Sequence, residues 1–287
     1  MKRWASSIRT GPAAAGRRQF LALLLSALLV PFVPLPRRKR AEAGTRTGSY
    51  VVDVKLLYGL FTLHLDGSFT EVVDPTAGRY HAIADGRGDG IASRVESSGL
   101  LRIGRWTPRE TRAHFDVMGR ESRSDVVYDW DRRTVDYRFR GETFFLRRVR
   151  AVHDVLPLSE SMRLDDAVSA MLNYREGRWP PEPDGSFWTQ MVRRKRREGE
   201  KPDDVEDRYR AEITPVTLRG AVDPGSGKRT ARFDLSPFSS WARPDRPATI
   251  VFGREGHPEQ ITMELILGTS ARLAFGGAEA RVSGRRA

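Results

Sequence analysis

The sequence predicts a mainly β fold, namely a curled antiparallel sheet or barrel-like meander with one packed helix. From Tyr50 onward, apolar and polar residues alternate with period two, which is typical of strands that bury one face. Turn residues separate successive alternating runs, which favours consecutive hairpins over alternating strands and helices. A helical period is found in one stretch, residues 164–175. Residues 44–287 are long enough to form a single β-rich domain.

The first 43 residues are predicted to be a cleavable export signal. Basic residues precede an uncharged, largely apolar run at 20–35, which prolines interrupt, so it is short for a membrane-crossing helix. A small-x-small site at Ala41 and Ala43 follows, which predicts cleavage immediately before Gly44. The alternative is an uncleaved inner-membrane anchor at 20–35, which would make the chain a membrane-anchored interaction module.

The signal resembles the twin-arginine export type, with the general secretory route as the alternative. An arginine pair precedes an aromatic and an aliphatic residue at the offsets of that motif, whose residues here are Arg17, Arg18, Phe20 and Leu21. Gly16 departs from the motif, in which Ser or Thr is usual. The basic cluster at 37–40 also favours this route, because the general route tolerates charge poorly there. The expected location is therefore periplasmic, with the export machinery as a partner and membrane contact only before cleavage.

The charge balance excludes nucleic acid as a predicted partner once the signal is set aside. The whole chain has 49 basic and 37 acidic residues and a net charge of +12. Nine of the basic residues and one of the acidic residues lie in the first 43, so 40 basic and 36 acidic residues remain, a net charge of +4. The chain has no cysteine, which excludes disulfides, thiolate metal sites and a cysteine nucleophile.

Successive strand pairs can be placed along the domain. Residues 60–65 alternate and are expected to return at 69–73 after a turn at Asp66 and Gly67, because Gly accepts positive φ without steric cost. A second hairpin is expected to join 124–129 to 134–139. The last strands are expected at 249–252, 261–266 and 271–275.

The helix at 164–175 is expected to pack an apolar stripe, including Met171 and Leu172, against the sheet, with Arg175 near its exposed end. Asp165 and Asp166 in its first turn suit the positive end of the helix dipole. The charged segment 193–207 joins a basic half to an acidic half and is interpreted as an exposed loop, with contact to a partner or anionic surface as the alternative.

No catalytic, cofactor-binding or metal-binding residue is predicted. The five histidines lie singly in the sequence, without a metal-binding spacing, and residues 225–230 lack the full phosphate-loop pattern. The glycine-rich stretch 85–90 is interpreted as a turn, with a calcium loop as the alternative. Asp165 and Asp166 could act as an acid/base pair only if one were buried with a raised pKa, and their sequence neighbours are polar or basic.

Several short stretches resemble the DUF3108 family of uncharacterised exported bacterial proteins. They are residues 50–55, the glycine-rich 84–94, Ser98 with Gly99, the Asp-x-x-Ser-Ala motif at 166–170, and the closing segment 241–268. The resemblance implies a β-barrel-like fold and no known activity. It does not extend to the charged segment 193–207.

The predicted function is that of an exported, non-enzymatic binding or structural envelope protein. A barrel of this size encloses either a packed core or a small cavity, so an apolar small molecule or lipid is the expected ligand. No cofactor is predicted. The alternative is a hydrolase or other enzyme whose site is assembled from residues far apart in the sequence.

Overall fold

The structure, a computed structural model, describes residues 44–282 with short gaps. These gaps are residues 57, 144–145, 160–161, 196–199, 201–203, 206–208, 240–241, 254–255, 267 and 277–278. The predicted signal residues Arg17, Arg18, Phe20, Leu21, Ala41 and Ala43 lie outside the described residues, and Gly44 is the first residue of β1.

One helix and fifteen strands make up the described part of the chain. The strands are β1 Gly44–Leu56, β2 Phe61–Asp74, β3 Arg79–Gly88, β4 Ile91–Arg102, β5 Arg105–Val117, β6 Glu121–Asp129, β7 Thr134–Glu142, β8 Val149–Pro157, β9 Ser186–Arg194, β10 Ala211–Val222, β11 Arg229–Phe233, β12 Ala248–Phe252, β13 Pro258–Leu265, β14 Thr269–Phe275 and β15 Glu279–Val282. The helix is α2, Ala167–Arg175.

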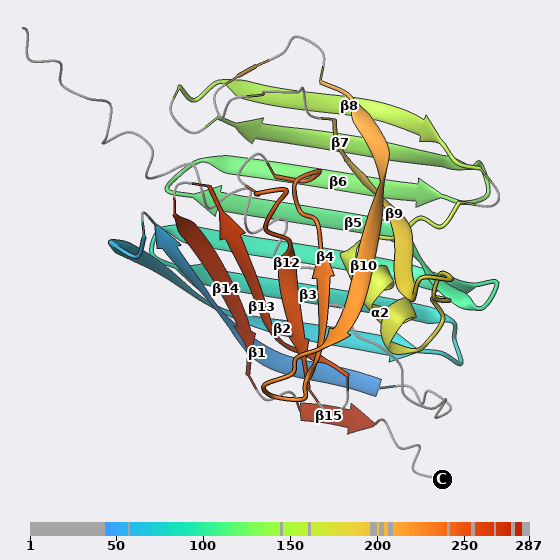
Figure 1. Cartoon of the computed structure of the whole chain (residues 1–287). Helices are drawn as coiled ribbons and strands as arrows, with labels where there is room; N and C mark the ends of the chain where they lie inside the picture. Colours follow the sequence, from blue (N-terminus) through green and yellow to red (C-terminus); the bar gives the residue numbers. More distant parts are fainter. Residues whose placement is uncertain are drawn as a thin grey trace, which may run out of the picture.

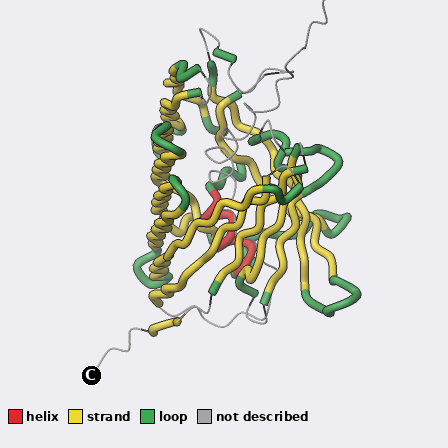
Figure 2. The backbone as a smooth tube through the Cα atoms, turned by 90° about the vertical axis from the view of Figure 1, so that its left-hand side faces the viewer, coloured by secondary structure: helices red, strands yellow, loops and turns green. Residues whose placement is uncertain are grey.

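The strands form a single antiparallel path that folds back on itself, which confirms the predicted fold class. Strands β8 to β1 follow one another in reverse chain order, β1 pairs with β14, and the path continues through β13, β12, β11 and β10 to β9. The two halves make two layers that cross at an angle (Figure 1). Viewed from the side, α2 lies between these layers (Figure 2). At the open seam, the Asp154 side chain of β8 accepts a hydrogen bond from the Ala211 amide of β10, at 2.6 Å.

The two layers meet at β1, and its alternation explains why the core lies there. Tyr50, Val52, Val54 and Leu56 are all at most 5% exposed and point into the space between the layers. Strands β10 to β14 also contribute buried residues to this space, so the main core is shared by both halves of the sheet. Burial of this apolar area is the main stabilising contribution to the curled fold.

The predicted turn at Asp66 and Gly67 is wrong. β2 runs unbroken through both residues, and Gly67 lies opposite Tyr50 in the register. A Cβ on Gly67 would lie 2.2 Å from Cζ of Tyr50, so the glycine makes room for a ring that lies across the strand. The chain turns instead at residues 58–60.

The other predicted hairpins are confirmed, whereas the exposed loop expected over 193–207 is contradicted at two places among the described residues. β6 pairs with β7, β12 with β13 and β13 with β14. The expectation of an exposed loop over 193–207 is wrong at its start, because β9 extends to Arg194. It is also wrong at Glu200, whose side chain is 3% exposed and pairs with Arg194 and Arg150.

The helix begins three residues later than predicted because Asp166 is its N-cap. Leu164 instead forms an isolated bridge with Gln190 of β9. The expected burial of Met171 and Leu172 is confirmed, at 6% and 0% exposure. The polar side chains Ser169 and Asn173 are buried as well, so the helix packs on more than the predicted apolar stripe. Among the described residues, no helix has the length and apolar character needed to cross a membrane.

Candidate functional site

The N-terminal end of α2 is held by a reciprocal cap. Asp166 Oδ1 accepts a hydrogen bond from the Ser169 amide at 2.7 Å, and Ser169 Oγ accepts one from the Asp166 amide at 3.0 Å. This is a capping box in which Ser takes the place of the usual Glu or Gln. The sequence pattern that resembled a family motif therefore has a local structural role in starting the helix.

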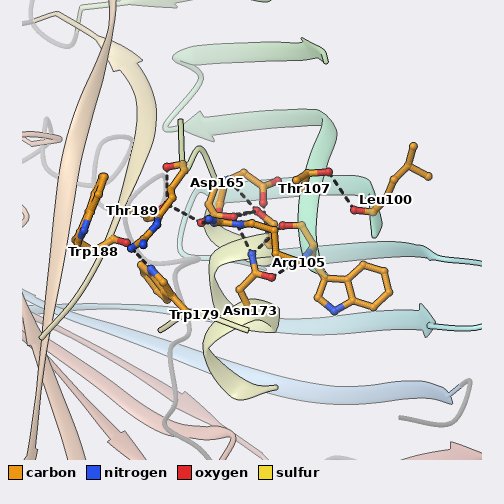
Figure 3. Close-up of polar contacts among 12 residues, drawn as sticks. Leu100, Arg105, Thr107, Asp165, Asn173, Trp179, Trp188 and Thr189 are labelled. Atoms are coloured by element: carbon orange, nitrogen blue, oxygen red, sulfur yellow. Dashed lines mark hydrogen bonds and ion pairs between the residues drawn. The ribbon is translucent and has the colours of Figure 1, made fainter. Parts of the chain in front are cut away.

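Asp165, the residue before the cap, lies in a buried polar network and has no exposed surface (Figure 3). Its Oδ2 accepts hydrogen bonds from the Arg105 guanidinium and from Thr189 Oγ1, the latter at 2.6 Å. Its Oδ1 accepts from Ser169 Oγ and from Asn173 Nδ2, both at 3.0 Å. Since Arg105 belongs to β5 and Thr189 to β9, one carboxylate ties the helix to strands of both layers.

Asp166 and Asn173 bind the helix to the β1–β8 layer through two hydrogen bonds each. Asp166 Oδ2 accepts hydrogen bonds from Ser97 on β4 and from Thr111 Oγ1 on β5, the latter at 2.6 Å. Asn173 pairs with both backbone groups of Trp106. Its Oδ1 accepts a hydrogen bond from the Trp106 amide at 2.7 Å, and its Nδ2 donates one to the Trp106 carbonyl at 2.8 Å. We call the set Ser97, Arg105, Thr111, Asp165, Asp166, Ser169, Asn173 and Thr189 the helix anchor.

Acid/base chemistry requires a carboxyl group with a raised pKa that can also reach a substrate, and the helix anchor meets the first requirement but not the second. Burial raises the pKa of Asp165 above its ordinary value, while Arg105 and the Thr189 hydroxyl oppose that rise. Both oxygens of Asp165, however, already accept two hydrogen bonds each from groups of the protein. An acid/base group must reach a substrate proton, and neither acid lines the crevice beside α2. The arrangement therefore favours a structural role for this carboxylate pair.

An apolar crevice of about 70 Å³ lies on another side of the same helix. Its walls come from α2, from β1 to β4 and from β13 and β14, so it lies between the two layers. The apolar side chains that line it include Phe69, Ala84, Val168, Met171, Leu273 and Phe275. We call this space the interlayer crevice.

A charged cluster borders the interlayer crevice. Glu71 lines the crevice and is 5% exposed. It accepts a hydrogen bond from Arg175 Nη1 at 2.8 Å, and the same nitrogen lies 3.4 Å from Nδ1 of His257. Burial, followed by the charges of Arg175 and Arg46, lowers the pKa of His257 to about 3, so the imidazole is neutral at physiological pH. The expectation that Arg175 lies at an exposed end is wrong, because its side chain is 14% exposed and ion-paired.

The remaining sequence candidates lie on outer strand faces and in turns. His81 and His153 pair with Glu96 and Asp136, and His64 pairs with both Asp53 and Asp66. In the glycine-rich stretch the strand β3 runs to Gly88, and the turn falls at Asp89 and Gly90. Among the described residues, no group of three or more His, Asp or Glu side chains is arranged to hold a metal ion.

Comparison with known proteins finds likeness to solved structures. No family model matches the chain, and no curated protein matches it. A crystal structure described as a beta-barrel-like protein of domain of unknown function DUF1849, from Brucella abortus, is similar over 88% of this chain and 99% of its own. The two chains share 12% sequence identity, and the TM-score is 0.39. A likeness of this extent does not identify a family or an activity.

Proposed function

We propose that this chain is an exported, non-enzymatic binding protein that accepts a small apolar group in the interlayer crevice. The observation that carries the proposal is the crevice itself, since its lining is mainly apolar and its walls come from both layers and the helix. Sites for small molecules are commonly concave and apolar with a few polar groups at one side. Here the polar side is the cluster of Glu71, Arg175 and His257.

The volume of the crevice limits what enters it. An engineered apolar cavity of about 150 Å³ holds one benzene molecule, and this crevice has about half that volume. A group of three or four carbons, such as the branched end of an acyl chain, matches this space better than a whole lipid does. The rest of a larger ligand would stay outside the crevice.

Export is supported by the sequence pattern of the first 43 residues, in which a basic region, a short apolar run and a small-x-small site follow one another. Cleavage before Gly44 would leave β1, Gly44–Leu56, in the exported chain. We expect the exported form to begin at Gly44, and mass spectrometry of the protein recovered from the periplasm measures its N-terminus. A mature chain that keeps Met1 and stays with the membrane fraction would favour the anchored alternative.

The binding proposal is tested by filling the crevice. Ala84→Leu adds three carbons to a residue that lines the crevice, whereas Ala221→Leu adds them at an exposed position of β10. Xenon, which enters apolar cavities of this kind, is the probe, and its NMR chemical shift in the presence of protein is the measurement. We expect a protein-dependent shift for the wild-type chain and for Ala221→Leu, and a clear loss for Ala84→Leu. Equal shifts in all three proteins would contradict the proposal.

Native mass spectrometry of the periplasmic protein then identifies the ligand. A retained small molecule that Ala84→Leu loses and Ala221→Leu keeps would support binding. Turnover of that molecule by the purified protein would instead favour the enzymatic alternative, with a site that the helix anchor does not supply.

A further inference from the structure

Five turns at one edge of the structure form a continuous row. Because β1 to β8 form an antiparallel meander, the turns after β1, β3, β5 and β7 all lie at the same edge of that layer, the left-hand side in Figure 1. The turn between β13 and β14 joins them, since the Tyr58 amide donates to the Gly268 carbonyl at 2.8 Å. Two more contacts continue the row: the Met118 amide donates to the Gly90 carbonyl at 2.7 Å, and Arg147 Nη2 to the Gly119 carbonyl at 3.4 Å.

Large apolar side chains are concentrated along this row. Tyr58 is 89% exposed, Leu60 74% and Leu146 58%. Less exposed members accompany them, namely Phe61, Met118, Val149 and Ile266. We call these seven residues the apolar rim. Single exposed apolar residues are ordinary, but a row of them along adjacent turns is typical of an interaction site.

The backbone of two of these turns indicates that the apolar residues are not there to favour the turn. Tyr58 and Gly59 both have positive φ, of 58° and 89°, and so do Met118 and Gly119, at 54° and 75°. Met118 and Gly119 form a two-residue turn, which favours Asn or Asp at its first position, as Asp89 and Gly90 show in the turn between β3 and β4. Tyr58 and Gly59 lie in the longer loop between Leu56 and Phe61. Tyr and Met pay a conformational cost in this region. Turn propensity therefore does not account for Tyr58 and Met118, nor for Ile103 at the opposite edge.

We propose that the apolar rim docks on the surface of a lipid bilayer that carries anionic headgroups. Its residues lie in or beside turns at one edge of the sheet and are exposed there, where a soft interface can reach them. Tyr58 has the amphipathic ring that is favoured at the headgroup level. The exposed Arg147 and Arg148 lie at the Leu146 end of the rim, where they would meet anionic headgroups. This contact would persist after signal cleavage, which differs from the expectation of membrane contact only before it.

The absence of cysteine from the chain permits a site-specific test. Leu60→Cys places an environment-sensitive nitrobenzoxadiazole label on the rim. Ile103→Cys places the same label on the opposite edge, at an apolar residue that is 103% exposed against 74% for Leu60. Both variants keep the same first 43 residues, so any contribution of that segment is equal. With vesicles of phosphatidylcholine and phosphatidylglycerol, we expect a several-fold rise in emission for the label at position 60 and little change at 103.

Charge reversal tests the arginines. Arg147→Glu with Arg148→Glu should lower the vesicle-bound fraction of protein about tenfold or more, because each arginine near an anionic surface contributes roughly fivefold to binding. Arg132→Glu with Arg133→Glu, in the exposed turn between β6 and β7, is the matched control and should change binding little. The proposal is overturned if both labels respond equally or neither responds. It is also overturned if the label at 60 responds to protein concentration without vesicles, which would indicate contact with a second copy.

Discussion

The two sides of α2 differ in what holds them. At its N-terminal end, the helix anchor joins two buried carboxylates to donors from β4, β5 and β9. Toward the crevice, Val168 and Met171 border an incompletely filled apolar space. Both oxygens of each carboxylate accept hydrogen bonds, and this fixes one geometry, because a shift leaves a buried donor or acceptor unpaired. An apolar wall beside a void has no such constraint, so the crevice side can adapt to a ligand while the anchor keeps the helix in place.

The largest effect is expected from breaking the anchor at its centre. Asp165→Ala leaves the Arg105 guanidinium, whose side chain is 18% exposed, and the buried Thr189 and Asn173 without their shared acceptor. Removing one partner of a buried ion pair commonly costs about 3–5 kcal/mol. We expect the free energy of unfolding, measured from urea denaturation, to fall by about this amount. Asp223→Ala, at an exposed turn acid that accepts hydrogen bonds from Ser226, is the control and should cost about 1 kcal/mol or less. Equal costs in the two variants would mean that the anchor does not stabilise the fold.

A smaller effect is expected when two neighbouring helix residues are truncated on opposite sides. Leu172 has no exposed surface and packs with Tyr80 and Trp106, whereas Met171 faces the crevice. Leu172→Ala should cost about 3–4 kcal/mol, in the middle of the range for buried aliphatic residues. Met171→Ala should cost about 2 kcal/mol, because part of its surroundings is already empty. Urea midpoints with unchanged slopes measure both, and a larger cost at Met171 would indicate that the crevice is in fact well packed.

Much of the fold was predictable because a strand with one buried face shows period-two alternation within its own short stretch of sequence. Period-two alternation located the strands of β6, β7, β12, β13 and β14, since one face of each is buried. Gly67 misled the prediction because a glycine at a turn and a glycine beneath an aromatic ring look identical in sequence. Gly67 is needed because the Tyr50 ring lies against it, and Tyr50 is distant along the chain and adjacent only in the strand register.

The candidate site was less predictable, because its residues come from separate elements. The sequence predicts that Met171 and Leu172 are buried, and this is confirmed. It gives no sign that Glu71 of β2, Arg175 of α2 and His257 before β13 lie together, since no motif links them. The burial of Asp165 was equally hidden, because its polar neighbours in sequence do not show that Arg105 and Thr189 surround it. Only the folded topology brings such residues together.

The smallest expected effect concerns the charged cluster beside the crevice and appears as a pH dependence. The pKa of His257 is lowered from 6.5 to about 3 in the folded protein, first by burial and then by Arg175 and Arg46. Below its unfolded pKa the unfolded chain therefore binds a proton that the folded chain does not, so stability is fully present above about pH 6.5 and is lost as the pH falls.

Replacing His257 removes the group that takes up this proton in the unfolded chain. The variant therefore isolates the contribution of His257 to the pH dependence of stability. Between about pH 7.5 and 5, the wild-type chain should lose at most about 2 kcal/mol of unfolding free energy through this group, which is partly accessible to solvent. His257→Gln should lack that loss while keeping an acceptor near Arg175, so the gap between the two proteins should narrow or reverse as the pH falls. Val155→Ala, at an exposed apolar side chain of β8 that has no titratable group, is the control, and its pH profile should run parallel to that of the wild type. A parallel profile for His257→Gln as well would mean that the imidazole takes up its proton in the folded state, and that the polar side of the crevice is as open to solvent as the outer strand faces.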